Sequence, residues 1–343
     1  MTSQPTAGPR PVAIAVDAMG GDFAPQEVVK GAIEASKKLG VAVLLVGDQE
    51  QVETQLRTID TGGAIYKVVP SQGRIEEGEH PAIALRRNPN VSVAVATGLV
   101  KMGKAQAMVS MGSTGGSMAA ATLGLGLLGG LERPCVGGPI LGALAPHTAI
   151  LDLGSNIDCR PQQMLSFAMM GCVFARKFFG VDNPTVALLS VGAEEGKGNK
   201  QVKEAYPLFK QSHLNFIGNV EGNDLFSGKA HVVVCDGFVG NVLLKFAESV
   251  GDVLAGYFAK RLRGKMPDRE LQVLGQEIWS LTNQSKRSSG PLFGVNGNVI
   301  VGHGASKAQE VAWAIETAKK CVDLDLANGI AKEFEQLKKA VET

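Results

Sequence analysis

The stretch VAIAVDAMGGD, residues 12–22, decides the fold class. It opens with small and β-branched apolar residues, a run typical of a strand that is buried on both faces of a parallel sheet. It closes with aspartates and glycines, and residues 23–39 then carry apolar side chains at helical spacing, with Pro25 in the first turn. This order of strand, glycine turn and helix predicts an α/β fold whose loops beyond the strand ends bind a ligand.

Two interpretations of the turn are open. The adjacent glycines Gly20 and Gly21 let a ligand approach the backbone, but the carboxylates of Asp17 and Asp22 repel phosphate unless a cation or a hydroxyl group intervenes. In the other interpretation this is a tight turn in which Asp22 caps the helix. We take all four residues as candidate substrate-binding residues.

Composition sets limits on the class of protein. The 343 residues suffice for one large α/β domain or two smaller ones, and the net charge of +1 gives no electrostatic case for nucleic acid. Without a long linker, we predict a flexible tail at residues 1–10 and a single α/β domain over 11–343. The N-terminus lacks the apolar core of a signal peptide, which indicates a cytoplasmic protein.

The cysteines and the charge-poor segments carry no site. The five cysteines are far apart and form no CxxC pair, so a zinc ribbon or a redox motif is not supported, and we expect buried free thiols and no metal. Residues 105–131 contain no charged side chain, yet their glycines divide them into a strand, a loop and a core helix, and not a membrane span. The GxGxxG match at 124–129 lies inside this helical run and indicates helix packing.

Strands alternate with helices along most of the chain, which predicts an α/β fold with a mostly parallel sheet. Further strands are predicted at residues 41–47, 65–69, 107–110, 149–153, 185–191, 216–220 and 232–235.

The chain changes character after Asn241. Residues 242–263 show apolar side chains at helical spacing, and a second amphipathic helix follows Pro267, which together predict a protruding helical hairpin over about 242–285. In one interpretation the hairpin packs on a dimer partner, and in the other its tip contacts anionic lipid. Both contacts can exist together. The residues in contact with the membrane would be Leu254, Phe258, Lys260, Arg261, Arg263 and Lys265, and an acidic protein is the alternative partner of the four cations.

Several catalytic motifs are missing from the sequence. The segment at 192–197 lacks the spacing of a nucleotide phosphate loop, and neither GxSxG nor HExxH occurs. What remains is a set of Gly-, Asn-, Ser- and Thr-rich loops with one lysine, Lys197, whose backbone and ammonium groups suit an oxyanion. Asn241 is either a helix cap or a donor to an acyl carbonyl, and Asp236 either anchors a turn or orients a donor.

Eight stretches in the same order resemble the PlsX family of bacterial phosphate acyltransferases. They are IAVDAMGGDFAP (14–25), EEGEHPAIALR (76–86), LERP (131–134), LDLGSNIDCRP (151–161), EEGKGN (194–199), NFIGNVEG (215–222), VCDGFVGNVLLK (234–245) and LFGVNGNVIVGHG (292–304). One loop departs from the family pattern, because Ser113 replaces an asparagine in SMGSTGG (110–116).

The resemblance implies a three-layer α/β/α sandwich similar to phosphate acetyltransferase and isopropylmalate dehydrogenase. It also implies a homodimer without cofactor that associates peripherally with the inner face of the cytoplasmic membrane. The implied reaction moves a long fatty acyl group from acyl-acyl carrier protein to inorganic phosphate, and the acyl phosphate feeds a membrane glycerol-3-phosphate acyltransferase. We assign Lys197 and Asn241 as catalytic residues and add Ser113, Thr114, Gly115, Gly116, Asn156, Asn199, Asp236 and Gly237 to the substrate-binding set.

Two other functions stay open. A metal-dependent hydroxyacid dehydrogenase on the related fold requires an aspartate cluster on facing helices and a nucleotide loop, which the sequence does not show. A scaffold that docks carrier protein on the membrane would use the hairpin and would not need Lys197 or Asn241.

Overall fold

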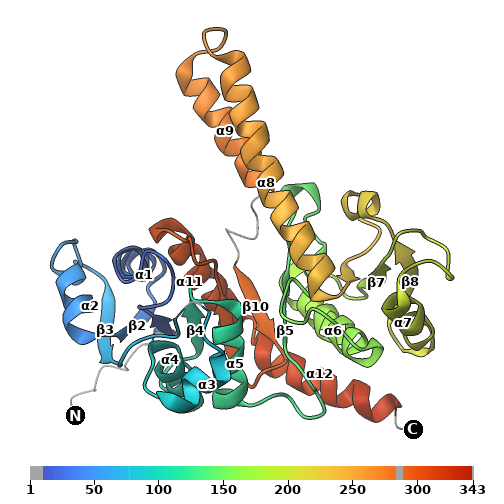
Figure 1. Ribbon diagram of the computed structural model, residues 1–343, viewed down its shortest axis with the longest axis horizontal. Helices are drawn as coiled ribbons and strands as arrows, with labels where there is room; N and C mark the ends of the chain where they lie inside the picture. The colour runs from blue at the N-terminus through green and yellow to red at the C-terminus, as the bar shows by residue number, and fades with distance from the viewer. Residues whose placement is uncertain (1–10, 77, 283–288, 342–343) are drawn as a thin grey trace, which may run out of the picture. The chain divides into compact units, whose positions relative to one another are not determined.

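The computed structural model describes residues 11–76, 78–282 and 289–341 (Figure 1). The predicted tail, residues 1–10, and the end of the predicted hairpin, residues 283–285, lie outside the described residues. Contacts within the chain group it into two compact units. Unit 1 comprises Met1–Leu125 and Gly302–Val322, and unit 2 comprises Gly126–Val301 and Asp323–Thr343.

Unit 1 contains a parallel sheet in the order β3-β2-β1-β4. Its strands are β1 (Ala13–Asp17), β2 (Ala42–Gly47), β3 (Ile65–Pro70) and β4 (Ala107–Ser110). The apolar residues of β1 are almost completely buried, which confirms the prediction of a strand covered on both faces. Because all neighbouring strands are parallel, the loops that follow them gather at one edge of the sheet.

The helices of unit 1 are α1 (Gln26–Leu39), α2 (Gln49–Leu56), α3 (Pro81–Arg87), α4 (Ser92–Lys101), α5 (Thr114–Leu125) and α11 (Ala308–Asp323). Helices α1, α2 and α4 pack on these strands, and α5 packs on α3 and α4. Helix α1 begins later than predicted, with Pro25 at its N-cap position and no side-chain cap. The cap suggested for Asp22 is therefore wrong, because the first helical turn starts too far along the chain for that carboxylate to reach it.

Unit 2 contains a mixed sheet in the order β11-β10-β5-β6-β9-β7-β8. Its strands are β5 (Cys135–Gly138), β6 (Ala149–Leu151), β7 (Thr185–Leu189), β8 (Asn215–Val220), β9 (Val232–Val234), β10 (Gly290–Phe293) and β11 (Asn298–Val301). The segment β6-β9-β7-β8 is parallel, whereas β5 and β10 pair antiparallel to their neighbours. The predicted fold class is confirmed, with an antiparallel portion that the sequence pattern did not indicate.

The helices of unit 2 include a long pair. The helical segments are η1 (Gly142–Leu144), α6 (Pro161–Phe174), the π-helical turn η2 (Ala175–Phe179), α7 (Lys200–Gln211), η3 (Gly222–Phe226), α8 (Gly237–Leu262), α9 (Asp268–Thr282) and α12 (Leu326–Val341). Helix α8 begins at Gly237, because the Asp236 carboxylate accepts the backbone N–H of Val239 at 2.8 Å. Asn241 thus lies inside the helix, and its alternative role as a cap is wrong.

Helices α8 and α9 pack along each other and project from the remainder of unit 2 (Figure 1). Val253, Leu254, Tyr257 and Phe258 on α8 keep more than a third of their surface exposed. No helix within the described ranges combines the length and apolar character that crossing a membrane requires.

Candidate active site

A buried carboxylate lies at the end of β1 in unit 1. Asp17 is 2% exposed and faces Ser110 on the neighbouring strand β4, whose hydroxyl donates to it at 2.7 Å. The backbone N–H of Met19 donates to the same carboxylate at 3.3 Å. Burial raises the pKa of Asp17, and these hydrogen bonds counteract only part of that rise.

The glycines after Asp17 fill a space that admits no side chain. A Cβ atom at Gly20 would lie 2.6 Å from the Asp17 carboxylate and 2.8 Å from the backbone nitrogen of Gly112. Gly21 has φ +104°, a left-handed conformation that favours glycine. The N–H of Asp22 donates to the carbonyl of Gly304 at 2.8 Å, and its carboxylate is exposed. These residues form one tight loop cluster in unit 1.

The second loop of unit 1 leads into α5. The Ser113 hydroxyl accepts the N–H of Gly116 at 3.1 Å, so it caps the helix where the family pattern has asparagine. Thr114 is the first residue of α5, Gly115 is exposed, and Gly116 is buried. Because N–H groups of a first helical turn lack intrahelical partners, this helix start suits an anion.

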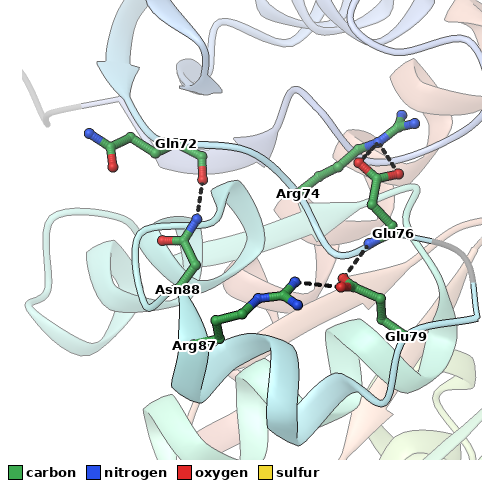
Figure 2. A network of polar contacts seen from close by, with 6 residues as sticks. All are labelled: Gln72, Arg74, Glu76, Glu79, Arg87 and Asn88. Atoms are coloured by element: carbon green, nitrogen blue, oxygen red, sulfur yellow. Dashed lines mark hydrogen bonds and ion pairs between the residues drawn. The ribbon is translucent and has the colours of Figure 1, made fainter.

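A polar network holds the segment before α3 (Figure 2). Arg74 pairs with Glu76 at 3.3 Å, and Glu79 accepts both the Arg87 guanidinium and the N–H of Glu76. Figure 2 also shows the Asn88 amide donating to the Gln72 carbonyl, at 2.7 Å. A Cβ atom at Gly116 would lie 3.3 Å from Ile75 Cδ1, so this segment lies against the start of α5.

Unit 2 has its own buried carboxylate, at the end of β6. Asp152 is fully buried and accepts the backbone N–H groups of Gly154, Ser155 and Asn156 at 3.0, 2.9 and 2.7 Å. It also accepts the Asn156 side-chain amide at 2.8 Å. Burial raises the pKa of Asp152, against the opposing effect of these donors. The carboxylate fixes the whole loop that follows the strand.

Asn156 connects three segments of unit 2. Its amide also donates to the carbonyl of Pro134 at 2.8 Å, and its own carbonyl accepts the N–H of Gly237 at 2.7 Å. Its Oδ1 is buried and has no hydrogen-bond partner in the part of the chain that the structure describes. Both amide hydrogens are therefore used within unit 2.

The start of α8 packs directly on the Asp152 loop. A Cβ atom at Gly240 would lie 1.8 Å from the Asp152 carbonyl oxygen, so the helix can come this close to the loop only with glycine at position 240. A Cβ atom at Gly154, which has φ +128°, would lie 3.3 Å from Asn241 Oδ1. The exposed Asn241 amide therefore lies over Gly154, beside the backbone of this loop.

Lys197 lies in the loop between β7 and α7. Its side chain is exposed and has no hydrogen-bond or ion-pair partner within the described ranges. Its stem lies over Gly192, where a Cβ atom would be 2.9 Å from Lys197 Cγ. Asn199 caps α7 through its side-chain oxygen, which accepts the N–H of Val202 at 2.9 Å. The lysine is thus held by its backbone and leaves its ammonium group available.

Sheet topology brings these loops of unit 2 to one edge. The strands β6, β9 and β7 are adjacent and parallel, so their carboxyl ends face the same way. The Asp152 loop, the Asp236 cap with α8, and the Lys197 loop follow these three strands in that spatial order. The basic turn of the helical pair is elsewhere, since Lys260 follows Asn241 by roughly 30 Å along the helix axis. Among the residues described, no three His, Cys, Asp or Glu side chains gather as metal ligands.

The chain matches a family model described as fatty acid synthesis protein over residues 12–328. The chain belongs to this family. The phosphate acyltransferase of Pelotomaculum thermopropionicum is 42% identical over 332 residues, which cover 94% of this chain and 95% of that relative. The phosphate acyltransferase of Desulforamulus reducens is 41% identical and covers 94% of this chain and 98% of its own. These findings confirm the resemblance to the PlsX family, and the chain is an acyltransferase by family.

Solved structures support the fold. A phosphotransacetylase from Streptococcus pyogenes aligns with a TM-score of 0.58 at 16% identity, over 95% of this chain and 94% of that one. The identity is low, so the likeness concerns the fold alone.

Three buried polar residues at or near strand ends, Ser110, Asp152 and Asn219, were not predicted from sequence as site residues. Ser110 and Asp152 follow the same rule as Asp17, because each ends an apolar strand just before glycine-containing residues. A comparison of VDAMGG with LDLGSN would have found Asp152. Asn219 lies near the end of β8 and gave no such signal, because it precedes a valine and belongs to the strand itself.

Proposed function

We propose that this protein reversibly transfers a long-chain fatty acyl group from acyl-acyl carrier protein to inorganic phosphate. The acyl phosphate formed would supply phospholipid synthesis. The observation that carries this proposal is the 42% identity, over 94% of the chain, to a protein named phosphate acyltransferase. The glycine and asparagine loops at the strand ends agree with it, because they offer donors to oxyanions.

The chemistry requires no nucleophile from the protein. A phosphate oxygen attacks the thioester carbonyl carbon and forms a C–O bond, which gives a tetrahedral oxyanion. The C–S bond then breaks, and the carrier thiolate leaves and takes up a proton from solvent. Phosphate is already nucleophilic near neutral pH, so the protein has to position it and stabilise the oxyanion.

Lys197, Asn241 and the glycine loops have different roles in positioning phosphate and stabilising the oxyanion. The Lys197 ammonium, which has no partner among the described residues, supplies positive charge to phosphate or to the oxyanion. The Asn241 amide, held over Gly154, donates to the acyl carbonyl oxygen. The loops at Gly20 and Gly115 in unit 1 and the loop at Gly237 in unit 2 complete the substrate-binding set, although the Gly237 N–H itself is donated to the Asn156 carbonyl.

The proposal extends to the surroundings of the enzyme. It includes a homodimer, carrier protein as the acyl donor, and peripheral contact with the inner face of the cytoplasmic membrane, where a glycerol-3-phosphate acyltransferase uses the product. The exposed apolar residues of α8 and the exposed cations of its turn support a contact with lipid or with acidic carrier protein.

The test follows phosphate-dependent release of the carrier thiol from palmitoyl-carrier protein and traps acyl phosphate with hydroxylamine. Palmitoyl-CoA serves as the competing donor. Product from the carrier-protein thioester alone supports the proposal. Product from the CoA thioester alone moves the activity toward the phosphotransacetylases, and no product from either thioester rejects an acyltransferase acting on phosphate.

Lys197→Ala tests the assigned role of the ammonium group. Because the side chain is exposed and makes no hydrogen bond or ion pair in the described part of the chain, the free energy of unfolding should stay unchanged. Turnover should fall about 100- to 1000-fold, since a preorganised charge near the oxyanion is lost. Steady-state kinetics and chemical denaturation of the same preparation measure both, and near-normal turnover removes Lys197 from the mechanism.

A further inference from the structure

Asn219 holds the Lys197 loop from the neighbouring strand. It lies near the end of β8, is 6% exposed, and donates its side-chain amide to the carbonyl of Glu194 at 2.9 Å. The same amide reaches the carbonyl of Lys197 at 3.4 Å. These two carbonyls belong to the ends of one turn, which the N–H of Lys197 closes on Glu194 at 3.0 Å. One buried side chain thus fixes both ends of the turn that carries the lysine.

The oxygen of the Asn219 side-chain amide, Oδ1, is buried without a hydrogen-bond partner among the described residues. The same holds for the hydroxyl oxygen of Ser190, the residue after β7. That hydroxyl lies beneath the same loop, because a Cβ atom at Gly198 would be 3.0 Å from it. An unpaired buried acceptor destabilises a fold, and a leucine, which has the same branched shape, would avoid this cost. The two donated bonds are therefore what asparagine supplies here.

Those bonds stabilise a loop and not the sheet. Glu194 and Lys197 lie outside every helix and strand, in the ten residues between β7 and α7. The Lys197 ammonium is exposed and unpaired within the described residues, so no polar contact of its own fixes its direction. Its direction depends on the backbone from which it extends, and that backbone is held by Asn219.

We propose that Asn219 is a positioning residue for Lys197 in the acyl transfer to phosphate. This inference rests on the proposed function. The Asn219 amide fixes the Glu194–Lys197 turn, so that the ammonium group meets the phosphate or the oxyanion without a search over loop conformations. Asn219 itself touches neither substrate nor reacting atoms.

The decisive variant is Asn219→Leu, which removes both donors and the unpaired acceptor and keeps the branched shape of the side chain. Its kcat/KM for the phosphate-dependent reaction should fall about 10- to 100-fold, because a small misplacement of a catalytic group is costly. The kinetic parameter that changes, kcat or KM for phosphate, should be the one that changes in Lys197→Ala. The unfolding midpoint should match that of the wild type.

The matched control is Asn215→Leu. Asn215 opens the same strand, is exposed, and donates to the carbonyl of Asn183 at 3.4 Å. This substitution is chemically identical at the other end of β8 and should leave kinetics unchanged. If Asn219→Leu does not fold, Asn219→Asp keeps the size and replaces the donors with an acceptor, and should lower the same parameter.

A double-mutant cycle separates positioning from general structural support. In the Lys197→Ala background, Asn219→Leu should cause no further loss, because the group that it positions is absent. Multiplicative losses, or wild-type kinetics in folded Asn219→Leu, overturn the inference. If the wild-type protein shows no phosphate-dependent release of the carrier thiol, the proposed function itself fails, which the wild-type assay reveals before any variant is compared.

Discussion

Two aspartates, one in each unit, take the same place in their strands. Asp17 ends β1 and Asp152 follows β6, and each is buried and accepts backbone N–H groups from the glycine-containing loop behind it. A buried carboxylate with several donors turns a flexible loop into a fixed one. Both carboxylates thus shape loops that we assign to substrate, and Asp17 itself stays a candidate substrate-binding residue.

The raised pKa of Asp17 has a consequence for stability. A carboxyl group whose pKa is higher in the folded state binds more protons there than in the unfolded chain, so stability falls as pH rises. The fall begins near the ordinary carboxyl value of 3.8 and ends once pH has passed the raised value. Asp17→Asn removes this titration and can still accept from Ser110.

Denaturation with urea between about pH 4 and about pH 8 measures this effect. The wild type should lose stability relative to Asp17→Asn as pH rises through that range. A difference that stays constant with pH, or that favours the wild type at higher pH, contradicts the raised pKa of Asp17. Replacement of the exposed Asp22 by Asn serves as the control, since that carboxylate is not buried.

At the scale of elements, the first turns of α8 unite the candidate site of unit 2. Asp236 caps the helix, Gly237 donates to Asn156, and Gly240 lies against the Asp152 carbonyl. Asn241 follows directly and is thereby placed over Gly154. The position of this side chain depends on how closely the helix approaches the loop.

Gly240→Ala should disturb that approach. The added methyl group meets the Asp152 backbone, and the free energy of unfolding should decrease by about 1–3 kcal/mol, with a loss of turnover as Asn241 shifts. Gly256→Ala is the control on the same helix, because nothing lies within 4 Å of its Cβ position. It should gain about 0.5–1 kcal/mol from helix propensity. Equal stability changes in the two variants would contradict the close contact.

Sequence patterns predicted most of the helices and strands, and the elements that they missed lack a recognisable pattern. Buried parallel strands such as β1 and β2 were recognised because their residues are uniformly apolar and end in glycine turns. The strand β5 contains two glycines and is only four residues long, so it carries no periodic signal. Likewise, the sequence marked Lys197 by its flanking glycines, but Asn219 is brought to that loop only by strand pairing.

At the scale of the molecule, the exposed surface of the helical pair suits a lipid surface. The exposed Leu254, Tyr257 and Phe258 on α8 lie within about two turns of the exposed Lys260 and Arg261, and Arg263 and Lys265 follow in the turn after the helix. Exposed apolar and cationic residues are found together in interfacial helices. Acidic carrier protein offers the same charge as anionic lipid. The two contacts differ in their need for apolar side chains.

Flotation with phosphatidylglycerol vesicles distinguishes them. Leu254→Ser combined with Phe258→Ser should reduce lipid binding several-fold, since buried apolar area is lost, while kcat with soluble palmitoyl-carrier protein is retained. Ile83→Ser combined with Met102→Ser changes exposed apolar residues of unit 1 and should leave flotation unchanged. Unaltered flotation of the α8 variant would reject the lipid contact.

Unit 1 consists of two separate segments of the chain, and this affects when it can fold during synthesis. Helix α11 completes unit 1 although all of unit 2's strands precede it; its Ala308 N–H donates to Glu27 at 2.8 Å, and α1 approaches it at Gly31. During ribosomal synthesis, the N-terminal sheet of unit 1 is therefore complete at Leu125, long before the helix α11 that begins at Ala308. A nascent chain cut after Leu125 lacks α11 and leaves that face of α1 uncovered, so unit 1 is complete only once the chain has been synthesised as far as Val322.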